Sequence, residues 1–163
     1  MALLALIAVS LGWAVLTLRN TSPVTLQACM EAESGARAWS CRQALYLLHP
    51  TMDEVQRLNA TAGAQLPVRI ADSTEAEPLL QHYLQAGVDI DSVDLRSPLK
   101  WTALHSVVFE GNAQAVRLLL EHGARIDVKD SKGRTALDLA RETLQKTPSP
   151  EAGQIVSMLE GRA

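Results

Sequence analysis

Apolar residues in the second half of the chain recur in two blocks that begin alike. Thr102-Ala103-Leu104-His105 opens the first block, and Thr135-Ala136-Leu137-Asp138 opens the second 33 residues later. The first opening is followed by apolar residues and glycine breaks at Val107, Val108, Gly111, Val116, Leu118, Leu119, Leu120 and Gly123. A fixed period of this length predicts stacked units, each of which buries its apolar face only against a neighbour.

The central block, residues 94–130, resembles the ankyrin pattern of a T-P-L-H turn, two short helices and a G-A-D hairpin. The resemblance implies an all-α fold class, an ankyrin repeat solenoid of about three helix-turn-helix repeats with β-hairpin tips. We assign the repeats to residues 61–93, 94–129 and 130–163. The last is expected to be atypical, because one face of a terminal repeat meets water.

The first repeat aligns with the central one without gaps. Leu66-Pro67-Val68-Arg69 falls on residues 102–105, and Gly87 falls on Gly123. Three extra residues then fit within residues 95–100, at the tip between two copies, where insertions do least harm. Leu66 and Arg69 replace the Thr and His that tie the family's turn together, so we expect this repeat to be less rigid.

Two helices are predicted between a linker, residues 20–35, and the repeats. The first covers residues 36–48 and ends at His49-Pro50, since a residue before proline is pushed out of the helical region. The second begins at Thr51, which has the spacing of a capping box with Glu54. We expect this pair, residues 36–60, to form a helical cap on the stack; a divergent fourth repeat is the alternative.

The N-terminal residues form an uncharged run, residues 2–18, which Arg19 closes. At ~1.5 Å per residue this run spans ~25 Å, slightly less than the ~30 Å hydrocarbon core of a bilayer. We assign residues 1–19 to a single membrane-spanning anchor; a signal peptide is the alternative, although no basic segment precedes the run and no A-x-A site follows it. Leu26-Gln27-Ala28-Cys29 resembles a lipoprotein cleavage box but lies well beyond the run.

Cys29 and Cys41, twelve residues apart, are the two cysteines of the chain. In an oxidising compartment they would close a loop worth ~3 kcal/mol; the alternative is two unpaired core residues. Arg19 slightly favours a cytoplasmic C-terminal side, whereas the cysteines favour the opposite side. Together with a resemblance to small, membrane-anchored bacterial ankyrin proteins, this predicts a single-pass protein of the bacterial inner membrane with periplasmic repeats.

Composition and motifs narrow the class of function. A net charge of −3 and a pI near 5.8 do not favour nucleic acid as a partner. The sequence has no phosphate-binding loop and no G-x-S-x-G or H-E-x-x-H motif, and its four histidines do not share a ligand spacing. The loop aspartates Asp89, Asp91 and Asp94 lack EF-hand spacing, and such residues often bond their own backbone. We therefore expect no enzymatic activity, small-molecule substrate, cofactor or metal.

The ankyrin resemblance also implies where a partner protein would bind. The family's contact positions are variable residues at the hairpin tips and after the turn, and His105 in the turn itself is structural. Carried over to this chain, the contact positions are Ser73, Thr74, Trp101, Phe109, Glu110, His122, Lys132 and Arg134. Either Trp101 and Phe109 face outwards together, with Glu110, Lys132 and Arg134 around them, or Trp101 folds over the inserted loop and Phe109 packs onto the next repeat.

The functional hypothesis is a membrane-tethered module that binds another protein and has no chemistry of its own. Two specific roles fit. One is an immunity protein that occludes a toxic effector delivered by type VI secretion, and the other is a partner that supports a periplasmic enzyme, such as catalase, in peroxide defence. A structural subunit of a membrane complex is the third alternative. All of these rest on analogy with the family, since a fold does not fix a function.

Overall fold

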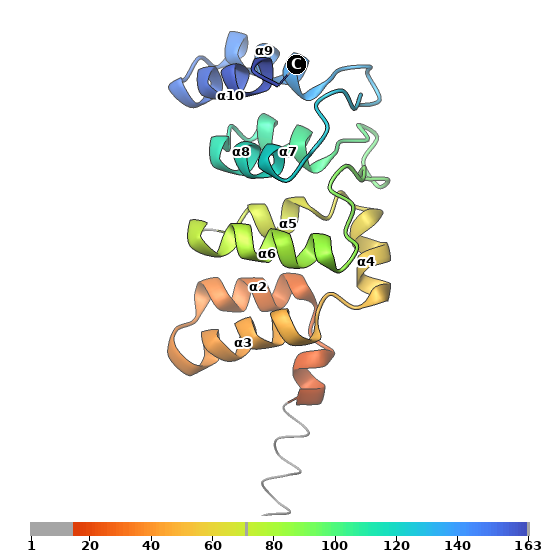
Figure 1. Ribbon diagram of the computed structural model, residues 1–163, viewed down its shortest axis with the longest axis vertical. Helices are drawn as coiled ribbons and strands as arrows, with labels where there is room; N and C mark the ends of the chain where they lie inside the picture. The colour runs from red at the N-terminus through yellow and green to blue at the C-terminus, as the bar shows by residue number, and fades with distance from the viewer. Residues whose placement is uncertain (1–14, 71, 163) are drawn as a thin grey trace, which may run out of the picture.

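The computed structural model describes residues 15–70 and 72–162, and this part of the chain is a stack of paired helices (Figure 1). From the N-terminal end the pairs are α2 (Pro23–Ala32) with α3 (Gly35–Leu48), α5 (Gln65–Val68) with α6 (Ser73–Gln85), α7 (Ala103–Phe109) with α8 (Ala113–Glu121), and α9 (Ala136–Lys146) with α10 (Pro150–Glu160). Helix α4 (Met52–Asn59) is not part of a pair and runs across the side of the stack beside the loops between pairs.

Side chains in the turns fix where the repeat helices begin. Thr102 accepts the N–H of His105, and the His105 ring faces the Thr102 N–H in return, which is a capping box. Thr135 and Asp138 make the same arrangement at the start of α9. These bonds satisfy backbone N–H groups that have no partner within a helix, so the two similar tetrapeptides are helix starts.

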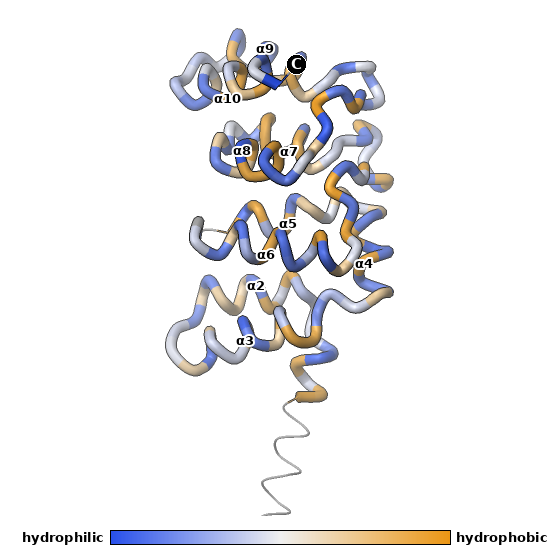
Figure 2. The backbone as a smooth tube through the Cα atoms, in the orientation of Figure 1, coloured by the Kyte–Doolittle hydropathy of each residue, from blue (hydrophilic) through white to orange (hydrophobic). Residues whose placement is uncertain are grey.

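The core lies between the layers and is aliphatic. Leu79 and Leu80 of α6, Leu104 and Val107 of α7 and Leu119 of α8 have 1% or less of their surface exposed. Figure 2 shows apolar residues recurring along the helices, with polar residues between them. Close packing of small side chains is what allows such short helices to stack.

The predicted linker at residues 20–35 is wrong, because most of it is helix α2. Ser22 caps this helix by accepting the Thr25 N–H at 3.2 Å, and Pro23 occupies its first position, where a missing N–H does no harm. Leu26 is buried, and the Gln27 side chain donates to the Leu66 carbonyl at 3.1 Å, which joins α2 to the next layer.

The outermost pair is therefore α2 with α3, and not the predicted pair at residues 36–60. The capping box of Thr51 and Glu54 is confirmed, but the helix that it starts, α4, belongs to the side of the stack. The Asn59 side chain at its end donates to the Gly87 carbonyl at 3.2 Å and accepts the Asp89 N–H at 2.8 Å. These bonds hold α4 against the loop that leaves the second layer.

The gapless alignment of the first repeat is also wrong, by about one helical turn. Ala64 stands at the N-cap of α5, so Leu66 lies inside this helix, whereas Thr102 is the N-cap of α7. Asp72 caps α6 through the Thr74 N–H, and α6 is 13 residues long whereas α8 has 9. The longer helix compensates for the earlier start, so both repeats reach their closing glycine in register.

The expected β-hairpin tips are loops in the part of the chain that the structure describes. Their pairing is limited to the two isolated bridges, Thr61 with Asp94 and Val93 with Thr102. Successive loops are instead joined by single hydrogen bonds, from Arg125 N–H to the Asp91 carboxylate and from Ser131 N–H to the Leu99 carbonyl, both at 2.9 Å.

Most of the predicted membrane anchor, residues 1–19, lies outside the described residues. Residues 15–19 are helical. None of the helices found within 15–70 and 72–162 combines the length and the apolar character that crossing a bilayer requires. The anchor stays a prediction from the sequence.

The first stability prediction concerns the two cysteines, which form a disulfide between α2 and α3 with Cα atoms 6.1 Å apart. Closing a loop of this length restricts the unfolded chain, so the double variant Cys29→Ser/Cys41→Ser is expected to lose about 3 kcal/mol of unfolding free energy. Urea unfolding with and without reductant measures the effect. The variant serves as the control, since reductant must not change it; a wild-type curve that ignores reductant would contradict the bond.

The second prediction concerns Tyr83, which is fully buried and whose hydroxyl has no hydrogen-bond partner among the described residues. Burial raises its pKa, and Glu54 and Tyr46 add to the rise. Tyr83→Phe removes an unsatisfied polar group and is expected to raise the unfolding free energy by about 1 kcal/mol. The matched control is Tyr46→Phe, which loses a hydrogen bond to Glu75 at 3.3 Å and is expected to lower it. A comparable loss in both variants would be the opposite result.

Candidate functional site

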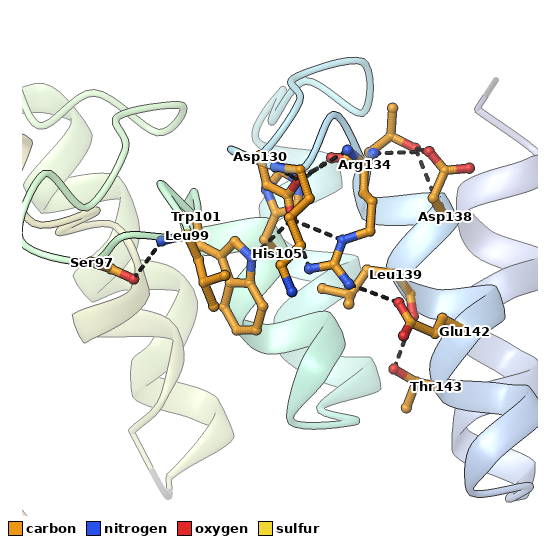
Figure 3. Close-up of polar contacts among 12 residues, drawn as sticks. Ser97, Leu99, Trp101, His105, Asp130, Arg134, Asp138, Leu139, Glu142 and Thr143 are labelled. Carbon is orange, nitrogen blue, oxygen red and sulfur yellow. Dashed lines mark hydrogen bonds and ion pairs between the residues drawn. The ribbon is translucent and has the colours of Figure 1, made fainter.

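A buried carboxylate organises the loop between the second and third repeats. The Asp130 side chain has no exposed surface, and Figure 3 shows it between Trp101 and Arg134. One of its oxygens accepts the Lys132 and Arg134 backbone N–H groups at 2.8 and 3.0 Å. The other accepts the Arg134 guanidinium at 2.8 and 3.0 Å and the Trp101 indole N–H at 3.2 Å. The carboxylate thus fixes both the loop and the indole ring.

The charge of Asp130 is stabilised by these donors. Burial by itself would raise the pKa of Asp130, but the hydrogen bonds, those from Arg134 foremost, outweigh it and lower the pKa to about 2. The remaining guanidinium nitrogen of Arg134 lies 2.7 Å from a Glu142 carboxylate oxygen. Both sides of the Arg134 guanidinium therefore bond to carboxylates within the fold. Arg134 was predicted to contact a partner, but here it holds the Asp130 carboxylate in place.

The two aromatic side chains, Trp101 and Phe109, lie against each other. Their ring centroids are 5.1 Å apart with the planes tilted by 50°, a favourable arrangement for an aromatic pair. Trp101 is half-buried, whereas Phe109 at the end of α7 is 58% exposed. We refer to Trp101 and Phe109 as the aromatic pair. Phe109 thus faces outwards, as one of the two alternatives from the sequence expected, whereas Trp101 is anchored between repeats.

Glu110, the residue next to Phe109, forms an ion pair with Arg69 of the preceding repeat. The Glu110 carboxylate accepts the Arg69 Nε–H at 3.0 Å and also its Nη2–H, so the pair is bidentate. Both side chains are about two-fifths exposed. Arg69 was not among the predicted contacts. The signal that points to it is the helix start at Asp72, since Arg69 then ends the first helix of its repeat.

The other predicted contact residues lie elsewhere on the stack. Ser73 and Thr74 begin α6 next to the capping residue Asp72, so they belong to the second helix of their repeat and not to the end of the first. His122 ends α8, with its ring 4.0 Å from the Glu77 carboxylate of α6. Lys132 is exposed in the loop of Asp130. The structure brings together Trp101, Phe109 and Glu110, with Arg134 beneath Trp101.

The loop aspartates make the backbone bonds that loops of this kind use. Asp89 accepts the Asp91 N–H, and Asp94 accepts the Arg96 N–H, each at 2.9 Å. Within the residues that the structure describes, no group of three or more His, Cys, Asp or Glu side chains is placed to hold a metal ion.

Comparison with known proteins gives the family. A family model described as ankyrin repeats in three copies matches residues 69–147. The chain is an ankyrin repeat protein. Among curated relatives it is 36% identical to the human inhibitor of Bruton tyrosine kinase over 72 residues, which is 44% of this chain and 5% of the relative. It is 36% identical to the mouse ankyrin repeat and SAM domain-containing protein 6 over 73 residues, which is 45% of this chain and 8% of the relative.

A human palmitoyltransferase, ZDHHC17, is 51% identical over 43 residues, which is 26% of this chain and 7% of that protein. The chain therefore spans less than a tenth of the length of these relatives.

His105 has the structural role that the ankyrin resemblance implies. The Thr102 hydroxyl lies 2.9 Å from His105 Nδ1, and Nε2 donates to the Arg134 carbonyl of the next ankyrin repeat at 3.2 Å. Burial lowers the pKa of His105, so the ring is neutral at neutral pH. His105 and Asp130 thus join the same two repeats, one through the Arg134 carbonyl and the other through its guanidinium.

The Asp130 network predicts a specific dependence of stability on pH. Because folding lowers the Asp130 pKa from 3.8 to about 2, its ionised form stabilises the folded state above pH 3.8, and this contribution is lost as the pH falls towards 2. A shift of this size corresponds to about 2 kcal/mol, which Asp130→Asn is expected to lose at neutral pH.

Urea unfolding at several pH values measures this effect. The difference between wild type and Asp130→Asn should shrink as the pH falls through this window. Asp127→Asn is the matched control, because the Asp127 carboxylate is exposed and pairs with Arg125 at the surface. A difference that stays constant with pH would show that Asp130 does not act through its charge.

Proposed function

We propose that this chain is a non-enzymatic protein-binding module, tethered to a bacterial membrane through residues 1–19, that takes its partner on the surface around the aromatic pair. One observation carries the proposal: Phe109 keeps 58% of its surface exposed while it lies against a Trp101 whose indole is fixed by Asp130. A large apolar side chain held in place at the surface of an ankyrin stack is the usual form of an interface anchor.

Ordering of the pair before binding favours affinity. The indole hydrogen bond to Asp130 at 3.2 Å fixes the Trp101 ring, and the ring contact restricts Phe109. A partner that covers both side chains then loses little side-chain entropy on this side of the interface. Tryptophan and tyrosine dominate interface hot spots for the same reason, as rigid side chains with a large contact area.

The charged residues beside the aromatic pair give the surface its selectivity. Glu110 and Arg69 form a pair that is still two-fifths exposed, and Lys132 is exposed in the neighbouring loop. A partner with an apolar centre and charged residues of both signs at its edge matches this arrangement. Such rim charges affect the association rate and the choice of partner more than the affinity.

The tether and the compartment are supported by two features of the N-terminal end. Residues 2–18 carry no charge, which suits insertion into a bilayer. The disulfide of Cys29 and Cys41 is a bond that persists in oxidising compartments such as the periplasm. We therefore place the stack on the periplasmic side of an inner membrane, where its partner is an effector that it occludes or an enzyme, such as catalase, that it supports.

The binding surface is tested by capturing partners with the full-length chain from detergent-solubilised native membranes and periplasm. Phe109→Ala is expected to weaken capture by about 30-fold, because a hot-spot truncation costs 2 kcal/mol or more. The matched control is Val24→Ala, which removes an apolar side chain of nearly equal exposure, 57%, from α2 in the first layer of the stack. Equal capture by both variants and wild type would reject the surface.

The identity of the captured protein separates the specific roles. A secreted lipase or other hydrolase whose toxicity the chain neutralises would support the immunity role. A catalase whose activity depends on the chain would support the second role. A set of membrane proteins that is lost when residues 1–19 are replaced by an unrelated anchor would favour a structural subunit over a tethered binding module.

A further inference from the structure

The N-terminal end of the stack exposes apolar side chains that the ankyrin repeats do not explain. Helix α3 is the outermost helix there (Figure 1), and Trp39 and Leu47 on it are 63% and 75% exposed. Val15 and Leu16, the first residues that the structure describes, are 53% and 54% exposed. Figure 2 shows the described chain starting in apolar residues below α3.

These side chains form one continuous surface. Trp39, Gln43 and Leu47 follow each other at four-residue intervals and therefore share one face of α3. A cleft of about 320 Å³ separates this face from residues 15–18, and it is lined mainly by Val15, Leu18, Trp39, Ala44, Leu47 and Leu48, with no charged residue among the described lining. We refer to this surface as the base.

The path of the chain into the base is fixed by a buried histidine. His49 is 3% exposed, and its Nε2 donates to the Leu18 carbonyl at 3.2 Å, while its Nδ1 lies 2.8 Å from the Glu54 carboxylate. The carbonyl of His49 accepts from the His82 ring at 2.7 Å. Residue 18 is thereby held to the stack, and Val15, the first residue that the structure describes, lies at the base.

We propose that the base lies on the membrane surface, with α3 parallel to the bilayer and Trp39 at the level of the lipid headgroups. The inference rests on the proposed tether, since it takes residues 2–14 as the segment that enters the lipid. A run that must reach the hydrocarbon starts beside an exposed apolar helix face, and tryptophan favours the membrane interface. Contact between α3 and lipid also buries side chains that would otherwise face water.

Contact between α3 and the membrane fixes the orientation of the stack relative to the bilayer. A stack that stands on α3 keeps α10, the last layer, farthest from the bilayer (Figure 1). The aromatic pair then lies well above the headgroups, on the side of the stack, where a protein from the aqueous compartment can reach it. The base is thus a lipid contact and the aromatic pair a protein contact, and the two are separate surfaces.

The three tryptophans of the chain, Trp13, Trp39 and Trp101, provide the test. Three full-length variants each keep one tryptophan and carry phenylalanine at the other two positions. Each is reconstituted into vesicles of phosphatidylcholine and phosphatidylglycerol that contain phosphatidylcholine brominated near the headgroup end or near the tail end of its acyl chains. Circular dichroism first verifies that all three are folded, and bromine quenching of the fluorescence then reports the depth of each indole.

The proposal expects shallow bromines to reduce the Trp39 emission by about half, because an indole at headgroup level lies close to them. Trp13 stands only two residues before Val15, at the start of the lipid-inserted run, so it should also be quenched by the shallow bromines, and Trp101 by neither set. Quenching of Trp13 without Trp39 would leave the tether intact and reject the lipid contact of the base.

Three other results also decide the question. Absence of quenching at both Trp13 and Trp39 would reject the tether and the base contact together. Quenching of Trp101 as well as Trp39 would mean that the stack lies on its side. Trp39 emission that is blue-shifted in detergent-free solution yet unaffected by bromine would show that residues 1–14 or a second copy of the chain covers the base.

Discussion

Stacking is the constraint on which the rest of this structure depends. A pair of helices as short as α7 and α8 cannot enclose a core, so its buried leucines and valines are shielded only by the layers on either side. Any layer therefore has to end in the same place as its neighbours, because a displaced helix would leave apolar surface uncovered on two sides. Hydrogen bonds between successive loops, such as Ser131 to Leu99 and Arg125 to Asp91, keep the layers in that register.

This constraint explains why the sequence predicted the central layers and misplaced the first repeat. The Thr102 and Thr135 tetrapeptides carry their own capping side chains, and those local bonds set the helix starts wherever the sequence occurs. The first repeat lacks such a start, since Ala64 stands at the N-cap of α5 and makes no side-chain capping bond. Leu66 to Arg69 then imitates the apolar pattern closely enough to attract the alignment. The extra turn in α6 restores the register from the other side, which only the packed structure reveals.

The residues of the candidate site likewise fall into two groups: those set by the local sequence and those that depend on bonds between layers. Trp101, Phe109 and Glu110 were predicted because they occupy variable positions of a recognisable repeat. The roles of Asp130, Arg134 and Arg69 depend on bonds between repeats, and no spacing along the chain contains that information. The linker error has the same origin: Ser22 and Pro23 signal a helix start, but the burial of Leu26 and the bond from Gln27 to Leu66 depend on the neighbouring layer.

The disulfide between α2 and α3 has a mechanical consequence. If one end of the chain is held at residue 20 and the stack is pulled from the aromatic pair, the load passes through α2 and α3 in series. Cys29 and Cys41 bridge the turn between these helices, so the segment that they enclose, residues 30–40, cannot lengthen under tension while the bond is intact. The layer nearest the point of attachment can therefore lengthen less under load than it could without the bond, whereas the ankyrin repeats are held by hydrogen bonds and packing alone.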